Sequence, residues 1–156
     1  MARTEYFNDP NAPRANSIVV ACTVFVTDDE DRVLLIRRTD NGLWAIPGGA
    51  QDIGEYIAET AVRETKEETG IEVEVTGLVG LYTNPHHVMA YTDGEVRQQF
   101  SICFRAGYLS GEPTASSESS KVRWIPHDEL AGLQIHPSMR LRIDHGYEYG
   151  PEPYIG

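Results

Sequence analysis

Three glutamates in one short segment carry the strongest chemical signal of this sequence. Glu64, Glu67 and Glu68 stand at positions i, i+3 and i+4, so a helix would place them on one side, within an arc of about 100°. Like charges at this spacing cost about a few tenths of a kcal/mol per pair, and a solvated acidic face is the ordinary alternative. Because carboxylate oxygens are the ligands that Mg²⁺ and Mn²⁺ prefer, the spacing predicts a site for a hard divalent cation.

The residues around the glutamates fit a cation or phosphate site. Arg63 precedes Glu67 by one helical turn and can hold its carboxylate in place. Upstream, Pro47-Gly48-Gly49 leads into a loop and then into the helix. Glycines let the backbone approach a phosphate or present a carbonyl to a metal. We therefore expect this turn and the glutamates to lie together.

One amphipathic helix must position the glutamates. Residues 55–69 place a stripe on one face, made of Ala58, Ala61, Val62, Thr65 and Thr69. Gly70 follows, where a helix commonly ends in the left-handed conformation. The glutamates lie beside this stripe, so the helix can pack on a sheet and still present them to solvent.

Strands alternate with helical segments along the rest of the chain. Apolar or alternating patterns predict strands at 18–26, 33–36, 43–46, 71–75, 78–82, 87–91, 99–106 and 121–125. Asp93-Gly94 is the turn signal between the strands at 87–91 and 99–106. A short helical turn is expected at 126–130 and a second helix at 137–146. The pattern indicates one α/β domain at residues 17–146, with an N-terminal arm at 1–16 and a C-terminal tail at 147–156.

Charge and composition narrow the class of partner. The 156 residues include 13 basic and 24 acidic side chains, for a net charge of −11. Such a surface repels phosphate backbones and argues against a general nucleic-acid or anionic-membrane binder. A small anionic substrate remains compatible, because bound cations invert the local field.

The two cysteines and the apolar runs indicate a cytoplasmic protein. Cys22 and Cys103 stand in strand-like apolar runs without a CxxC motif, which predicts two buried thiols in a reducing compartment. The N-terminus carries no signal-peptide pattern. The longest apolar run, residues 18–26, is too short to cross a bilayer.

The spacing from Gly49 to Ile71 resembles the Nudix box, the signature of the Nudix hydrolase family. Gly49 is followed by five residues and Glu55, then by seven residues and Arg63-Glu64, then by Glu67-Glu68 and Gly70-Ile71. All seven fixed positions of that pattern are present. Thr65 stands where the family usually has an apolar residue, and its place on the inward stripe makes this a difference in packing. The approach Trp44-Ala45-Ile46-Pro47-Gly48-Gly49 also resembles the family.

The resemblance implies an α/β/α sandwich with a mixed β-sheet, and hydrolysis of a nucleoside diphosphate linked to another moiety with the help of Mg²⁺ or Mn²⁺. By this resemblance the metal ligands are Glu64, Glu67, Glu68 and the carbonyl of Gly48. Arg63 orients the glutamates, and Glu55 serves the start of the helix, where an anion is favourable. Glu118 is a candidate for a further ligand or the general base, with Glu112 as its rival. Which carboxylate acts as the base stays open.

Contacts to the substrate are weaker expectations. Arg38 resembles a phosphate-binding arginine of the family, with Arg37 second, and strand alternation sends the two side chains to opposite faces. Aromatic residues that could stack on a base are Trp44, Tyr82 and Phe25, although each also suits a core position. Further polar candidates near the rim are His86-His87 and Arg97-Gln98-Gln99.

Four functions remain as alternatives at this point. A hydrolase of ADP-ribose or nucleotide-sugar type is favoured, and a hydrolase of (oxidised) dNTPs is the alternative within the class. A non-catalytic Nudix-fold nucleotide-binding protein is disfavoured, because all box glutamates are present. The related isopentenyl diphosphate isomerases use a catalytic cysteine, and Cys103 instead stands in a core-like strand. The arm at 1–16 and the habits of the family also suggest a homodimer.

Overall fold

The computed structural model describes residues 2–148 and 150–156, which form two β-sheets and three helical segments. The helices are α1 (Ile57–Thr69), the 3₁₀ helix η1 (His127–Gly132) and α2 (Pro137–Tyr147). The strands are β1 (Arg3–Phe7), β2 (Ser17–Ile18), β3 (Ala21–Thr27), β4 (Val33–Arg38), β5 (Trp44–Ala45), β6 (Gly48–Ala50), β7 (Glu72–Tyr82), β8 (His87–Tyr91), β9 (Val96–Gln98), β10 (Ser101–Ser110), β11 (Ser119–Ile125) and β12 (Tyr154–Ile155).

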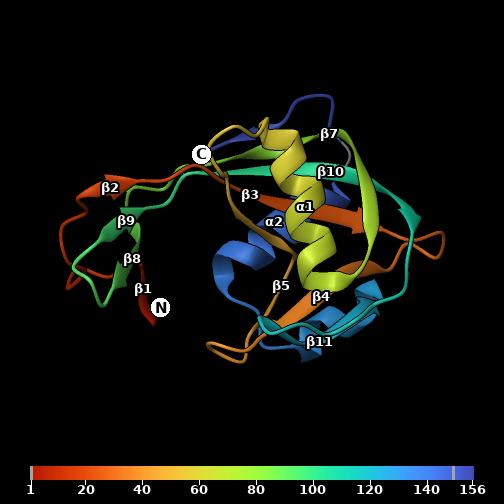
Figure 1. Cartoon of the computed structure of the whole chain (residues 1–156), viewed down its shortest axis with the longest axis horizontal. Coiled ribbons are helices and arrows are strands. Elements are labelled where there is room, and N and C mark those ends of the chain that lie inside the picture. Colours follow the sequence, from red (N-terminus) through yellow and green to blue (C-terminus); the bar gives the residue numbers. More distant parts are fainter. Residues whose placement is uncertain (1, 149) are drawn as a thin grey trace.

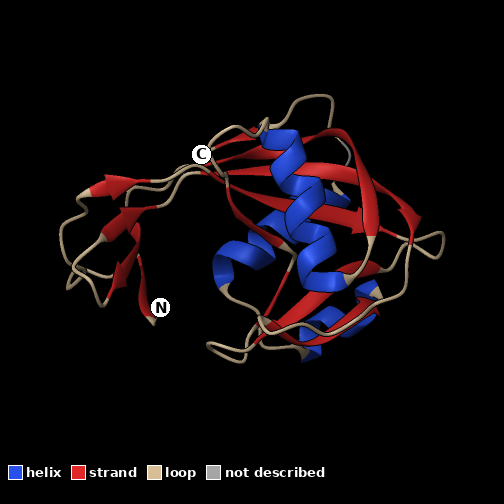
Figure 2. Ribbon diagram, in the orientation of Figure 1, coloured by secondary structure: helices blue, strands red, loops and turns tan. Residues whose placement is uncertain are grey.

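The main sheet is mixed and lies between helices. Its strand order is β11-β4-β3-β10-β7-β12, and β5 and β6 add to β4 and β3. The central strand β10 runs parallel to β3 and antiparallel to β7. Helix α1 covers one face of the sheet and α2 the other (Figures 1 and 2). This arrangement confirms the predicted α/β/α sandwich.

The core consists of two apolar layers, one on each face of the sheet. On the first face, Ala61 and its neighbours on α1 pack over Val24 and Ile71. On the second face, Ile143 of α2 and Leu130 of η1 pack over the opposite side of the sheet. β3 is buried on both faces, which explains its nearly continuous run of apolar residues.

A smaller sheet, with the order β1-β8-β9-β2, lies to one side of the sandwich (Figure 1). Residues 3–7 of the expected arm form β1, which pairs antiparallel with β8 so that Glu5 lies opposite Met89. The predicted pairing of 87–91 with 99–106 is wrong. β8 pairs with β9 across the Asp93-Gly94 turn, and β10 belongs to the main sheet. The chain changes sheets between Gln99, whose N–H bonds to the small sheet, and Ser101.

Two further segments differ from the predicted elements. Residues 72–82 form one continuous strand, β7, although two separate strands were expected. The pairing of β7 with β10 contains register shifts. The expected tail contains β12, which pairs parallel with β7 at the edge of the main sheet. Within the part of the chain that the structure describes, no helix is long and apolar enough to cross a membrane.

Candidate active site

Glu55 ties the loop before α1 to the helix itself. Its Oε1 accepts hydrogen bonds from the backbone N–H of Asp52 at 2.9 Å and from the hydroxyl of Thr60 at 3.0 Å. The helix begins two residues later and ends at Gly70, whose φ of 75° is the left-handed conformation that glycine adopts without strain. The carboxylate therefore fixes where α1 starts.

Arg63 holds three glutamates with one guanidinium. Its Nε and Nη2 donate to the two carboxylate oxygens of Glu55 at 2.7 and 2.9 Å. Its Nη1 donates to Glu64 at 2.9 Å and to Glu67 at 3.3 Å. The hydrogen bond from Arg63 lowers the pKa of Glu55 to about 2. This planar fork orients carboxylates in a way that a lysine could not reproduce.

Glu68 is a buried carboxylate with few partners of its own. It is 4% exposed, and its Oε1 accepts a hydrogen bond from the N–H of Gly48 at 3.1 Å. Burial raises its pKa to about 8, and the neighbouring charges of Glu64 and Glu118 act in the same direction. Burial also raises the pKa of Glu64. The protein alone therefore does little to offset the negative charge of Glu68, whereas Glu64 has Arg63 as a partner.

A divalent cation fits this deficit. Carboxylate oxygens of Glu64, Glu68 and Glu118 lie within 4.8 Å of one another, which is close enough for one ion to contact all three. Gly49 leaves room for Glu64, because a Cβ at this position would lie 2.4 Å from the carboxyl carbon of Glu64. A hard cation would supply the positive charge that offsets these carboxylates.

The other predicted ligands lie differently. The side chain of Glu67 is 59% exposed and is held by Arg63 at the mouth of the cavity described below. Gly48 meets Glu68 through its N–H, and the role of its carbonyl stays a prediction. Glu118 lies just before β11, where its side chain is exposed beside the buried pair. Its rival Glu112 lies in the loop beside Gly70 and is not part of the cavity lining.

A cavity of about 490 Å³ extends from these glutamates to the small sheet. This volume is in the usual range for small-molecule sites. The cavity brings together several of the predicted substrate contacts, namely Arg38, Trp44, His87, Arg97, Gln98 and Gln99. Arg38 also forms a two-pronged ion pair with Asp40, at 2.9 and 2.6 Å.

Other predicted contacts lie outside the cavity. Arg37 is exposed and donates to the carbonyl of Gly42. Tyr82 faces α2, where its hydroxyl lies 2.8 Å from His145 Nδ1 and the guanidinium of Arg142 lies over its ring. The cavity lining also excludes Phe25, which packs in the core, and His86, which is exposed.

Sequence reasoning missed much of the cavity wall that lies away from the glutamates. The missed residues include Arg3 and Glu5 of β1, Ser101 at the start of β10, His136 just before α2 and Arg142 within α2. The hydroxyl of Ser101 and the Nε of Arg142 are buried without a hydrogen-bond partner among the described residues, so both can still bond to a ligand. The one available signal was the run Thr4-Glu5-Tyr6-Phe7, which is rich in strand-forming residues.

Both cysteines are free and buried, as predicted. Burial raises the pKa of the Cys22 thiol to about 12 and that of Cys103 to about 11. Neither thiol is a reactive nucleophile at neutral pH. This finding weighs against the isomerase alternative, which needs a catalytic cysteine.

The sandwich places a cluster of three carboxylates beside the cavity, an arrangement that suits a divalent cation. A NUDIX domain match covers residues 17–145. The chain belongs to the Nudix hydrolase family, whose members act on pyrophosphate bonds.

Several relatives cover most of the chain. A MutT-like protein of Streptomyces ambofaciens is 37% identical over 129 residues, which are 81% of this chain and 76% of that protein. A Bacillus subtilis protein with the provisional name 8-oxo-dGTP diphosphatase is 42% identical over 122 residues, 78% of this chain and 74% of its own. The ADP-ribose pyrophosphatase of Methanocaldococcus jannaschii is 32% identical over 112 residues, 69% of this chain and 62% of its own.

Solved structures show the same fold. A NUDIX hydrolase from Nitrosomonas europaea superposes with a TM-score of 0.72 at 23% identity, covering 90% of this chain and 78% of that one. An ADP-ribose pyrophosphatase from Streptococcus suis superposes with a TM-score of 0.67 at 20% identity, covering 90% of this chain and all of that one. At this level of identity the likeness concerns the fold alone.

Proposed function

We propose that this protein is an Mg²⁺-dependent pyrophosphohydrolase that cleaves a nucleoside diphosphate linked to another moiety, with ADP-ribose or nucleotide sugars as the favoured substrates. The observation that carries this proposal is the cavity, which runs from the glutamates of α1 to the small sheet. Such a cavity has room for a diphosphate at the glutamates and for a further group toward the small sheet. Mn²⁺ is the alternative cation.

The chemistry is assigned to the residues at the glutamate end. Glu64, Glu68 and Glu118 hold the cation, and Glu67 adds a carboxylate at the mouth. Arg63 keeps Glu64 and Glu67 oriented through its hydrogen bonds. The bound cation neutralises the diphosphate and lowers the pKa of a water molecule. Glu68 and Glu118 are the two candidates for the base.

Contacts to the substrate come from the remaining lining. Arg38 supplies positive charge to the diphosphate, which competes with Asp40 for the guanidinium. Trp44 is 8% exposed and lines the cavity, where its indole could contact a base. Ser101 at the start of β10 and Arg142 on α2 keep hydrogen-bonding groups without a partner among the described residues, and a sugar or a base would find donors there.

Hydrolysis of an oxidised dNTP is a second candidate. It is favoured by the 42% identity to the Bacillus subtilis protein whose provisional name gives that activity. Both reactions use the same glutamates, and they differ in the group that leaves. The small-sheet end of the cavity would therefore distinguish them.

Product analysis tests both candidates at once. The protein would be incubated with ADP-ribose, nucleotide sugars, dNTPs and 8-oxo-dGTP, each with Mg²⁺ or with EDTA, and the products separated by chromatography. Release of a nucleoside monophosphate together with a sugar phosphate supports the favoured proposal. Release of a nucleoside monophosphate together with pyrophosphate supports the second. Saturable binding without products would support the non-catalytic alternative.

The cellular setting belongs to the same proposal. Two buried free thiols are typical of a reducing compartment, so we place the protein in the cytoplasm. A homodimer remains our expectation for the assembly. Light scattering on the full chain and on a chain that lacks residues 1–16 would test it.

A further inference from the structure

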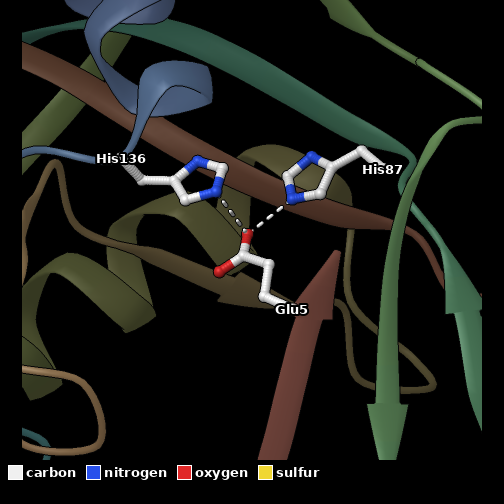
Figure 3. Close-up of side chains that lie close together, drawn as sticks. All are labelled: Glu5, His87 and His136. Atoms are coloured by element: carbon white, nitrogen blue, oxygen red, sulfur yellow. Dashed lines mark hydrogen bonds and ion pairs between the residues drawn. The ribbon is translucent and has the colours of Figure 1, made fainter. Parts of the chain in front are cut away.

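A second cluster of metal-ligating side chains lies on the far wall of the cavity (Figure 3). Glu5 comes from β1, His87 from the start of β8, and His136 from the position just before α2. The Nε2 atoms of both histidines point toward the same carboxylate oxygen, Glu5 Oε1, at 2.5 Å for His87 and 3.7 Å for His136. Segments more than 40 residues apart in sequence thus converge on one point.

The three side chains are sheltered and held in place. His87 is 4% exposed, while Glu5 and His136 are partly buried with side-chain exposures of 20% and 17%. The ring of Phe7 packs edge-on against both imidazole rings, with centroid distances of 5.2 Å. All three ligating side chains line the cavity, so an ion at this position remains accessible to small molecules.

The three side chains share protons when no metal is present. His87 Nε2 lies within hydrogen-bond distance of Glu5 Oε1, so a proton occupies that contact. A divalent cation would take the place of this proton, and its binding would release protons to solvent.

Ser138 orients the imidazole of His136. Its Nδ1 lies 2.8 Å from the hydroxyl of Ser138 and 3.2 Å from the backbone N–H of the same residue. With the proton on Nδ1, the imidazole donates to that hydroxyl and leaves the lone pair of Nε2 free for an ion. With the proton on Nε2, Nδ1 instead caps α2. Metal binding would select the first tautomer.

We propose that Glu5, His87 and His136 form a second divalent-cation site, of the Zn²⁺ class, separate from the glutamate site on α1. Two imidazole nitrogens and one carboxylate are a donor set typical of zinc, whereas Mg²⁺ prefers oxygen ligands alone. Bonds of about 2.0–2.2 Å in a tetrahedral arrangement place ligand atoms about 3.3–3.5 Å apart. The pair Glu5–His136 is already near this separation, and rotation of the Glu5 side chain would open the distance to His87.

A bound ion would have a structural effect in addition to its chemistry. It would join β1 and β8 of the small sheet to the start of α2, which packs on the main sheet. The far wall of the cavity would then be fixed relative to the glutamates. This inference does not depend on which substrate the protein hydrolyses.

Zn²⁺ titration of a variant without the α1 site tests the proposal. The untagged double variant Glu64→Gln/Glu68→Gln, stripped with EDTA and then freed of it, would be titrated with Zn²⁺ in competition with a chromophoric chelator. We expect one tightly bound equivalent that millimolar Mg²⁺ does not displace. Co²⁺ in place of Zn²⁺ should give visible absorption bands of a four-coordinate site with nitrogen ligands.

Substitutions in the same background locate the ion. His136→Asn keeps a good residue before α2 and removes the imidazole, and His87→Gln and Glu5→Gln keep polar groups of similar size. Each should weaken Zn²⁺ binding by more than about 100-fold, beyond what loss of an outer partner costs. His86→Gln changes the exposed neighbouring histidine and should leave the affinity unchanged. Thermal melts without metal show whether each variant is folded.

Four results would overturn the proposal. One is the absence of saturable Zn²⁺ binding in the folded double variant. Another is an affinity that none of His136→Asn, His87→Gln and Glu5→Gln reduces. The third is a Co²⁺ spectrum without four-coordinate bands. Loss of binding in His86→Gln would likewise place the ion elsewhere.

Discussion

The backbone N–H of Gly48 donates a hydrogen bond to Glu68 Oε1 across 3.1 Å, and this contact joins β6 to the last turn of α1. It gives one hydrogen bond to a carboxylate that is only 4% exposed. The remaining lone pairs of Glu68 are free to meet a cation. The glycine turn and the helix thus form one unit, and changes in either should affect metal binding.

Glu68→Gln should reduce kcat by two or more decades, or about 3 kcal/mol in the activation free energy, while the fold is retained. The amide keeps the shape and the contact with Gly48 but loses the charge that holds the cation. Steady-state kinetics with saturating Mg²⁺ would measure the loss. The exposed Glu74→Gln is the matched control and should retain full activity. Near-wild-type turnover in Glu68→Gln would contradict the proposed site.

Gly48 and Gly49 should respond differently to substitution by alanine. A Cβ at Gly48 would lie 2.1 Å from the carbonyl oxygen of Cys22, which is backbone in the main sheet. Gly48→Ala should therefore lower the free energy of unfolding by about 1–3 kcal/mol or more. A Cβ at Gly49 meets the flexible carboxylate of Glu64, which can move away. Gly49→Ala should weaken Mg²⁺ binding by about 10–100-fold with little loss of stability.

Urea denaturation and Mg²⁺ titration of the two glycine variants would separate these effects. Equal losses of stability in Gly48→Ala and Gly49→Ala would contradict the distinction drawn from the two contacts.

The metal-free protein should become less stable as the pH rises. The pKa of Glu68 is about 8 in the folded protein, against an ordinary value of 4.5. Between these pH values the folded state keeps a proton that the unfolded state has lost, so the free energy of unfolding falls with increasing pH. Thermal melts in EDTA from pH 5 to pH 8 would show this decline.

Two comparisons check the origin of that pH dependence. Glu68→Gln should flatten the decline, since the amide does not titrate. Addition of Mg²⁺ at pH 8 should restore the stability of the wild-type protein and not that of Glu68→Gln. Identical pH profiles for the two proteins in EDTA would argue against Glu68 as the titrating group.

Arg63→Lys should lower activity by about 10–100-fold, although the charge is preserved. A lysine has one ammonium group and cannot reach Glu55, Glu64 and Glu67 together, as the fork of Arg63 does. The loss should be largest at low Mg²⁺, because misoriented glutamates bind the ion more weakly. Activity measured across a Mg²⁺ series would test this. A loss that is independent of Mg²⁺ would assign Arg63 another role.

Tyr82→Phe should leave KM and kcat within about twofold of wild type and cost about 1 kcal/mol of stability. The hydroxyl contacts His145 in the layer beneath α2, away from the cavity. Kinetics and a urea melt of the same sample would give both values. A large rise in KM would return Tyr82 to the set of substrate contacts.

The box and its helix were predictable because local spacing encodes them. A helical stripe, a terminating glycine and three glutamates within five positions fix α1 and its acidic face without knowledge of the rest of the chain. The structure also explains the unusual Thr65, whose side chain is buried and whose hydroxyl bonds back to the carbonyl of Ala61 at 2.7 Å. Its hydroxyl is thus satisfied inside the helix, and the methyl group packs inward.

The far wall of the cavity was not predictable in the same way. Glu5, His87 and His136 meet only because β1 pairs with β8 and because α2 begins beside them. No local period relates positions so far apart. The switch between sheets at Gln99–Ser101 carries no glycine or proline, so the sequence offered no break at which to end one strand and begin another. Tyr82 was similarly ambiguous, because a buried aromatic suits a core and a binding site equally.

In the described part of the chain, the two ends of the cavity depend on different strand pairings. The glutamates lie on α1, which packs on the main sheet, and the far wall is formed largely by the small sheet. A mutation in β1, β8 or β9 can therefore change the shape and polarity of that wall without disturbing the hydrogen bonds around Arg63 and Gly48. If the far wall selects the substrate, as the proposed function implies, selection on substrate choice and selection on hydrolysis would act largely on different stretches of the gene. A lineage could then acquire a new substrate through changes in the small sheet while the residues around the glutamates are inherited unchanged.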